Sequence, residues 1–236
     1  MSSGEDLQDR AQRLSATVRL GGPVEDFERV GRMQLAVLLL QGLRPGSRVL
    51  DVGCGCLRAG YWLMHFLDPG CYFGIEPDPE VLQAGLDVIV EADTVARAQA
   101  SFSNRDDFDF SEFATTFDFV LARSIWTHAS KAQIERMLDQ FVATANPGAV
   151  MMASYLPGGR FPGLAAHYPS LALRLPARDY GGDEWVGQSH TSTRAGMVRH
   201  SFRWITSVCE RRGLAVAQLP DHVVNGQYWL RIDRGA

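Results

Sequence analysis

The chain has 236 residues, a length near the upper end for one compact domain, and its 46% hydrophobic and 21% charged residues are ordinary for a soluble globular protein. The formal net charge of −4 argues against a nucleic-acid binder, which would usually carry a basic excess. Four cysteines in a chain of this length do not form a disulfide framework, so we expect reduced thiols and a cytoplasmic protein. The N-terminus is polar and acidic, unlike a signal peptide, and the longest apolar run, Leu35–Leu40, is too short to span a bilayer.

The predicted elements alternate between helices and short apolar strands. Residues 1–24 are expected to form an N-terminal arm or short helix that acts as a lid, and residues 25–236 a single domain. Apolar stretches predict strands over residues 49–52, 71–76, 100–102, 117–122 and 149–155. Helical spacing predicts helices over residues 25–43, 57–67, 79–91 and 131–145. This alternation is typical of an α/β protein with a parallel sheet covered by helices on both faces.

The pattern changes after the strand that ends at Tyr155. Residues 157–195 are rich in Gly, Pro, Tyr and His without a clean period, and a loop of that length is usually functional, so we expect a substrate-side insertion there. A helix is predicted over residues 197–212, followed by strands over 214–219 and 227–232. Asn225–Gly226 lies between these strands and predicts an antiparallel hairpin.

A glycine turn follows the first strand. Asp51 lies at the strand's carboxyl end, Gly53 and Gly55 follow, and a helical pattern starts at Leu57. Such a turn suits a nucleotide-like cofactor, because glycines allow close approach and the first helical N–H groups are unpaired. A phosphate-binding P-loop would need a Gly-Lys-Ser/Thr end, and a dinucleotide fingerprint would need a third glycine where this chain has Arg58.

The run Asp51-Val52-Gly53-Cys54-Gly55 resembles the first motif of class I S-adenosylmethionine-dependent methyltransferases. The stretch from Gly53 to Gly60, with Val30-Gly31-Arg32-Met33-Gln34 before it, is similar to a bacterial subgroup with a Gly-Cys-Gly-x-Leu-Arg-x-Gly turn. Segments 72–76, 106–110, 117–128 and 226–230 also look like that subgroup. One departure is Leu57, where the broader class often has a third glycine.

This resemblance implies a Rossmann-like methyltransferase fold: a seven-stranded, mostly parallel sheet with an antiparallel last strand and helices on both faces. It also implies that S-adenosylmethionine is the cofactor. Glu76, at the end of the second predicted strand, would bind both ribose hydroxyls, since a carboxylate is a bidentate acceptor. Arg58 would pair with the methionine carboxylate through its guanidinium fork.

The resemblance implies further roles for residues at positions that match the family's motifs. Gly53, Cys54 and Gly55 would bring backbone close to the methionine and ribose parts, and Asp107 would accept from the adenine amine beside the apolar ring of Phe108. Ala122 and Arg123, at the end of the fourth predicted strand, would flank the methionine part. The complete set assigned to the cofactor is Asp51, Gly53, Cys54, Gly55, Arg58, Glu76, Asp107, Phe108, Ala122 and Arg123.

Several of these assignments have a structural alternative. Asp51 can instead cap the turn by accepting from backbone amides. Arg58 can instead be an ordinary surface residue of its helix. Asp107 competes with Asp106 and Asp109, since a cluster of acids is usually a solvated face.

Cys54 and Cys56 are potential metal ligands, but two cysteines alone do not make a metal site. A metal site normally needs four ligands with recognisable spacing, and no second Cys/His cluster accompanies them, so no metal is expected.

Three histidines are candidates for a general base. Methyl transfer needs the acceptor placed in line with the activated methyl, and a hydroxyl acceptor also needs its proton removed, a usual task of histidine. His128 follows the fourth predicted strand, while His190 and His200 flank the irregular segment and its helix. For His128 the alternative is a capping or supporting role in its loop.

We therefore expect a methyltransferase acting on a small molecule, with oxygen favoured as the acceptor atom in secondary or sugar metabolism. It would act as a monomer or homodimer, without nucleic acid or membrane. One alternative is an NAD(P)-dependent oxidoreductase, against which the absent third glycine speaks. Another is a non-catalytic S-adenosylmethionine-binding protein, against which the intact Asp51, Glu76 and glycines speak. A nucleic-acid methyltransferase would be expected to carry a basic module, which the chain lacks.

Overall fold

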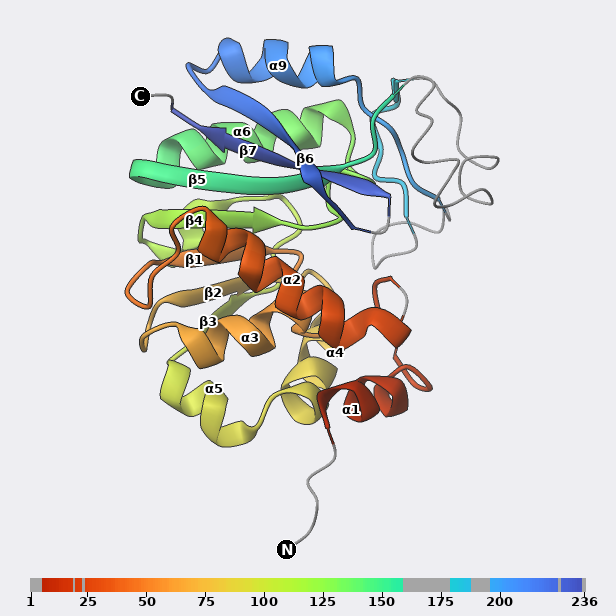
Figure 1. Cartoon of the computed structure of the whole chain (residues 1–236), viewed down its shortest axis with the longest axis vertical. Coiled ribbons are helices and arrows are strands. Elements are labelled where there is room, and N and C mark those ends of the chain that lie inside the picture. The colour runs from red at the N-terminus through yellow and green to blue at the C-terminus, as the bar shows by residue number, and fades with distance from the viewer. Residues whose placement is uncertain are drawn as a thin grey trace, which may run out of the picture. The chain divides into compact units, whose positions relative to one another are not determined.

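The computed structural model describes residues 6–18, 20–22, 24–158, 179–187, 196–224 and 226–234. The chain divides into a first compact unit that ends at Asp106 and a second that begins at Asp107. Its strands form a seven-stranded sheet in the order β3-β2-β1-β4-β5-β7-β6 (Figure 1). The expected mostly parallel sheet with an antiparallel last strand is confirmed.

The first unit contains the parallel strands β1 (Val49–Val52), β2 (Tyr72–Ile75) and β3 (Ser101–Ser103). Every residue of β1 and β2 is buried, as their apolar sequences require. The register sets Asp51 of β1 opposite Gly74 of β2. Parallel strands end at the same edge, so the residues that follow β1 and β2 lie next to each other.

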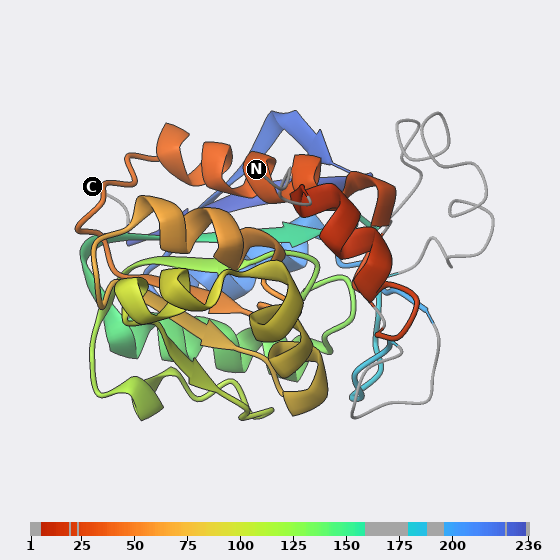
Figure 2. The same ribbon diagram turned by 90° about the horizontal axis from the view of Figure 1, so that it is seen from below.

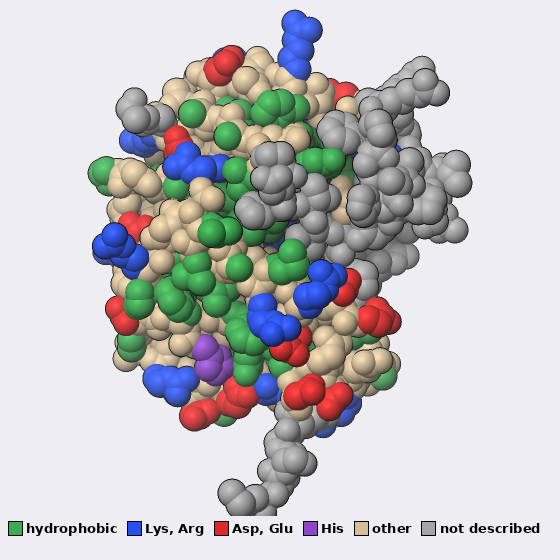
Figure 3. All heavy atoms as spheres, in the orientation of Figure 1, with side chains coloured by type: hydrophobic (Ala, Val, Ile, Leu, Met, Phe, Trp, Pro, Cys, Tyr) green, Lys and Arg blue, Asp and Glu red, His purple; other side chains and the backbone are tan. Residues whose placement is uncertain are grey.

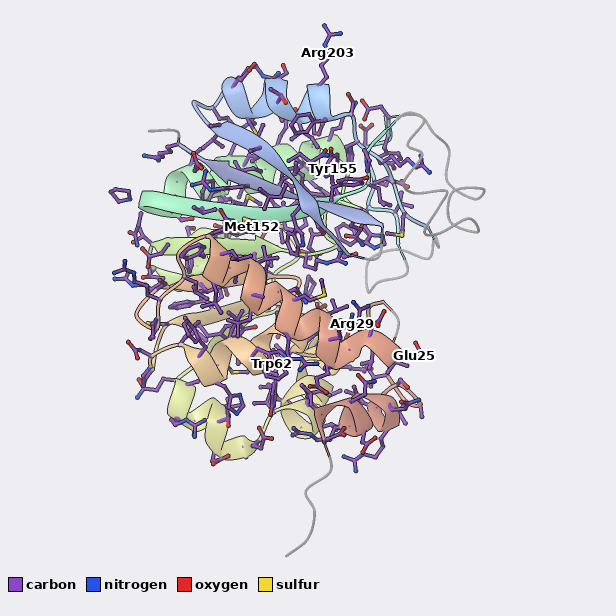
Figure 4. The ribbon with its side chains drawn as sticks, viewed as in Figure 1. Glu25, Arg29, Trp62, Met152, Tyr155 and Arg203 are labelled. Atoms are coloured by element: carbon purple, nitrogen blue, oxygen red, sulfur yellow. The ribbon has the colours of Figure 1, made fainter. Side chains whose placement is uncertain are left out.

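Two helices, α2 (Phe27–Leu40) and α3 (Arg58–Phe66), lie side by side over one face of these strands (Figures 1 and 2). Gly31 of α2 lies at their contact. A Cβ atom there would come within 2.4 Å of the Arg58 carbonyl oxygen and 2.8 Å of Trp62 Nε1. Figure 4 shows Trp62 beside α2. The close approach of the two helices therefore requires glycine at position 31.

The chain between β2 and β3 differs from its prediction. The expected helix over 79–91 is α4 (Pro79–Ala84), continued by the π-helix η2 (Gly85–Ile89), and a further helix, α5 (Ala92–Ala98), was not predicted. Asp78 caps α4 as expected, accepting from the amides of Glu80 and Val81. Helix α5 buries only Thr94 and Ala98, too weak an apolar pattern to reveal it in the sequence.

The N-terminal helix α1 (Leu7–Leu14) buries Leu7, Ala11 and Leu14, in line with the short helix expected there. Its Gln8 side chain donates to the Val24 carbonyl at 2.7 Å, and Arg10 forms an ion pair with Glu91 at 2.8 Å. These contacts fasten α1 to the rest of the first unit.

The second unit contains β4 (Phe117–Ala122), β5 (Ala145–Tyr155), β6 (Ala215–Val224) and β7 (Gln227–Asp233). Strand β5 is parallel to β4, whereas β7 is antiparallel to both β5 and β6, which confirms the predicted closing hairpin. Helix α6 (Lys131–Thr144) packs against β5 and begins with a capping box formed by Ser130 and Gln133. The short helix η3 (Phe110–Phe113) precedes β4 in the sequence.

The helix predicted over 197–212 is shorter. It is α9 (Phe202–Glu210), which packs against β6 and starts where the Ser201 hydroxyl accepts from the Trp204 amide. The preceding residues are not helical, because His200 forms a bridge with Pro157 and its N–H donates to the Leu156 carbonyl at 3.0 Å. His200 is therefore held by the chain end that follows β5, not by a helix.

Leu39 and Leu40, at the end of α2, are 41% and 66% exposed. Figure 3 shows hydrophobic side chains on the face of the molecule that it draws. Within the described part of the chain, no helix is both long and apolar enough to cross a membrane.

Replacing Gly31 with Ala should lower the free energy of unfolding by about 1–3 kcal/mol, the usual cost of overpacking, despite the better helix propensity of alanine. Urea unfolding measures this. Gly46→Ala is the matched control, because a Cβ there meets nothing closer than 3.5 Å. Equal effects of the two substitutions would show that position 31 does not limit the approach of α2 to α3.

Candidate functional site

The turn between β1 and α3 is bonded to the end of β2. The amides of Gly53 and Cys54 donate to the Ile75 carbonyl at 2.8 and 3.0 Å. Gly53, Gly55 and Leu57 all have positive φ values, of 71°, 56° and 65°. Leu57 thus occupies a left-handed conformation that glycine adopts more easily, which accounts for the glycine common at this position in the broader class.

Glu76 lies beside this turn, as expected. Its Oε2 accepts the Gly55 amide at 3.0 Å and its Oε1 accepts the Asp78 amide at 3.0 Å. Asn104 donates to the Glu76 carbonyl at 2.7 Å, so the backbone is held as well. Backbone groups therefore orient the carboxylate at the end of β2, next to the backbone of Gly55.

Asp51 is 3% exposed and accepts a hydrogen bond from the Tyr72 hydroxyl at 3.0 Å. Burial raises the pKa of Asp51 to about 7; the bond from Tyr72 lowers it, and the negative charge of Glu76 adds to the rise. Gly60 of α3 makes room for the hydroxyl, since a Cβ there would lie 2.6 Å from the Tyr72 oxygen. Tyr72 was not predicted to belong to the site, although it begins the 72–76 segment that resembles the subgroup.

The Arg58 side chain contacts residues that lie earlier in the chain. Its guanidinium donates to the Gly21 carbonyl and lies over the Phe27 ring, 4.8 Å from the centroid. The residue is therefore not an ordinary surface arginine, because it fastens the segment before α2 to the start of α3. Its expected pairing with the methionine carboxylate stays a prediction.

The thiols of Cys54 and Cys56 are buried. Burial raises the pKa of Cys56 to about 12 and that of Cys54 well above its ordinary value, so both are neutral thiols at pH 7. Among the residues that the structure describes, no group of three or more His, Cys, Asp or Glu side chains is arranged to hold a metal.

Asp107, predicted to bind adenine, and its competitor Asp109 differ in their surroundings. Asp109 accepts from the Ser111 amide at 3.0 Å and thereby caps η3. Asp107 is exposed and accepts from the Asp109 amide at 3.2 Å. Phe108 has a φ of 56° and a half-buried ring, 6.5 Å from that of Trp185. Asp109 is thus engaged in capping, and the role of Asp107 toward adenine stays a prediction.

Ala122 is the buried last residue of β4, and Arg123 follows it. The Arg123 guanidinium donates to Ser154 Oγ at 3.2 Å and to Gln227 Oε1. Ser154 Oγ also accepts the Ser124 amide at 2.7 Å. Arg123 is therefore part of a polar network that joins the ends of β4 and β5 to the start of β7. Ser154 and Gln227 were not predicted, because their role depends on strand pairing.

His128 is half-buried after β4, and a later part of the second unit surrounds its ring. The ring Nδ1 lies 2.7 Å from the Val186 carbonyl oxygen and 3.1 Å from that of Gly196. The Trp185 ring lies 5.5 Å away, tilted by 32°.

His200 is 0% exposed, and its Nε2 lies 3.0 Å from the Ala129 carbonyl oxygen. Burial lowers the pKa of His200, so the ring is neutral at pH 7. This sealed position favours a structural role over a catalytic one. His190 and residues 159–178 and 188–195 of the expected insertion lie outside the described residues.

A sequence profile described as a methyltransferase domain matches residues 27–219. The chain belongs to this methyltransferase family. The expected class I S-adenosylmethionine-dependent methyltransferase is thereby confirmed as family and as enzyme.

Solved structures similar to this methyltransferase share its fold. Magnesium protoporphyrin IX methyltransferase (ChlM) from Synechocystis with bound SAH is 18% identical, with 96% of this chain and 94% of that chain covered and a TM-score of 0.63. The DhpI–SAH complex is 15% identical, with 97% and 93% covered and a TM-score of 0.60. The pyocyanin biosynthetic protein PhzM is 14% identical, with 90% and 57% covered and a TM-score of 0.61.

The glycine turn of this methyltransferase fits the cofactor of its family. A Cβ built on Gly55 meets no atom within 4 Å, so space is open beside the backbone that bonds to Glu76. An oriented carboxylate next to open backbone suits a ligand with neighbouring hydroxyl donors.

In this methyltransferase Asp51 should make stability depend on pH. With a folded pKa of about 7 and an ordinary value of 3.8, the folded protein binds more protons than the unfolded one between these values. The free energy of unfolding should therefore fall as the pH rises from about 4 to about 7, and less steeply in Asp51→Asn. Urea unfolding at several pH values measures both slopes. Identical slopes would mean that Asp51 titrates normally in the folded chain.

Proposed function

We propose that this methyltransferase transfers a methyl group from S-adenosylmethionine to a small molecule, with a hydroxyl oxygen as the preferred acceptor. The observation that carries the cofactor part is the Glu76 carboxylate, oriented by the amides of Gly55 and Asp78 at the end of β2. ChlM is named for magnesium protoporphyrin IX and PhzM for pyocyanin biosynthesis, which supports a small-molecule acceptor here. The net charge of −4 also favours a small molecule over nucleic acid.

For the cofactor we propose the following roles. When bound, S-adenosylmethionine supplies a methyl group already activated by the sulfonium. Glu76 accepts from both ribose hydroxyls, and the backbone of Gly53, Cys54 and Gly55 lines the methionine and ribose parts. Asp107 accepts from the adenine amine, beside the apolar ring of Phe108. Arg58, Ala122 and Arg123 serve the methionine part, and Asp51 is the remaining residue assigned to the cofactor.

For proton removal we propose His128 as the general base. Its ring is half-buried after β4, whereas His200 is sealed in the interior of the second unit. A base must reach the proton that it abstracts, so accessibility decides between the two. His190 remains a prediction from the sequence alone.

We also propose that residues 1–24 cover the cofactor side of the first unit. Arg58, within the glycine-turn motif, bonds to Gly21, and α1 is tied to the body of the unit because Gln8 accepts from the Glu28 amide and Arg10 pairs with Glu91. The arm is thereby connected to the turn by a side chain of the turn itself.

Calorimetric titration tests the proposed cofactor site. Wild-type protein should bind S-adenosylhomocysteine (SAH) saturably and should not bind NADH. Glu76→Ala should weaken SAH binding by roughly 1–3 kcal/mol through lost charged hydrogen bonds. Glu80→Ala, an exposed carboxylate on α4, is the control and should bind like wild type. Absence of SAH binding by the wild-type protein would overturn the proposal, and unchanged affinity in Glu76→Ala would remove the ribose role.

A screen of hydroxylated acceptors tests the catalytic part. With an acceptor found in that screen, His128→Ala should slow turnover by about a hundredfold or more while SAH affinity stays near the wild-type value. His65→Ala replaces a helix histidine of the first unit and should leave turnover unchanged. A small effect of His128→Ala would exclude it as the base, and cofactor binding without turnover on any acceptor would indicate a non-catalytic protein.

A further inference from the structure

The backbone of Val186 and of Gly196 bonds to His128. The Val186 amide donates to the His128 carbonyl at 2.8 Å, and the Val186 carbonyl oxygen lies 2.7 Å from His128 Nδ1. One residue thus bonds both the backbone and the ring of His128. The Gly196 carbonyl oxygen, 3.1 Å from the same nitrogen, adds a second acceptor.

These contacts determine where the proton lies on the neutral imidazole. A carbonyl oxygen can only accept a hydrogen bond, so Nδ1 must carry the proton to bond with Val186 and Gly196. In a neutral ring the other nitrogen, Nε2, is then the basic one. The same carbonyl dipoles also stabilise the ring once Nε2 has gained a proton and the imidazolium is positively charged.

Gly187 explains why the ring can lie so close to this backbone. A Cβ at position 187 would be 2.7 Å from His128 Nδ1 and 3.1 Å from its Cγ. At such a distance the ring would have to shift, and the Trp185 ring lies near it, with a centroid separation of 5.5 Å. A side chain at position 187 would therefore push Nδ1 away from its acceptors.

We propose that Val186 and Gly187 are positioning residues that fix His128 in the Nδ1–H tautomer, with Trp185 holding the ring plane, so that Nε2 serves as the base. This inference rests on the proposed function and adds residues to its base step. In that step the acceptor hydroxyl gives its proton to Nε2 as its oxygen bonds to the methyl carbon. The electron pair of the broken sulfur–carbon bond stays on sulfur.

Nitrogen-15 NMR of the imidazole rings in the protein without cofactor tests the tautomer directly. The His128 signals are identified by their loss in His128→Ala. In wild type, Nδ1 should be the protonated nitrogen. In Gly187→Ala, the ratio of the Nδ1–H to the Nε2–H form should fall by about fivefold or more, the effect of losing one ordinary hydrogen bond.

Gly181→Ala is the matched control, because it lies in the same segment and a Cβ there meets nothing within 4 Å. It should keep the wild-type tautomer ratio. A wild-type His128 protonated on Nε2, or an unchanged ratio in a folded Gly187→Ala, would overturn the inference. The wild-type spectrum decides even if Gly187→Ala does not fold. SAH titration of the same proteins separates the two proposals, since lost SAH binding by wild type would overturn the proposed function whatever the tautomer.

Discussion

The hydrogen bonds between the glycine turn and the end of β2 are the constraint on which the first unit depends. Gly53 and Cys54 bond to the Ile75 carbonyl, and Gly55 bonds to the Glu76 carboxylate one residue later. The parallel pairing of β1 and β2 makes this possible, because it brings both strand ends to one edge. The positions of the glycine turn and Glu76 are therefore coupled, because a displacement of one would displace the other.

The glycines around this arrangement serve different physical needs. Gly31 admits the α2–α3 contact, Gly60 admits the Tyr72 hydroxyl that bonds to Asp51, and Gly74 leaves room for Cys54, whose Sγ would lie 2.9 Å from a Cβ there. Gly55, by contrast, faces open space. Within the Gly53–Gly60 motif, Gly60 thus meets a packing requirement and Gly55 suits ligand approach, while Gly31 and Gly74 meet packing requirements outside the motif.

Local patterns predicted much of the fold and part of the site. Apolar runs and turn residues predicted strand β1, the capped start of α4 and the closing hairpin. The resemblance predicted that Glu76 belongs to the same site as the glycine turn, to which it is hydrogen-bonded. Contacts between distant residues could not be predicted. The Tyr72–Asp51 bond depends on strand register, and Arg58 bonds to Gly21, a partner 37 residues away. The His128 contacts depend likewise on a segment 58 residues later.

A crystal structure of the complex with SAH tests the central claim most directly. Both ribose hydroxyls should lie within hydrogen-bond distance of the Glu76 carboxylate, while the Gly55 amide keeps its bond to the same side chain. A ribose bound away from Glu76, or a turn that breaks from Glu76 to admit the ligand, would contradict it.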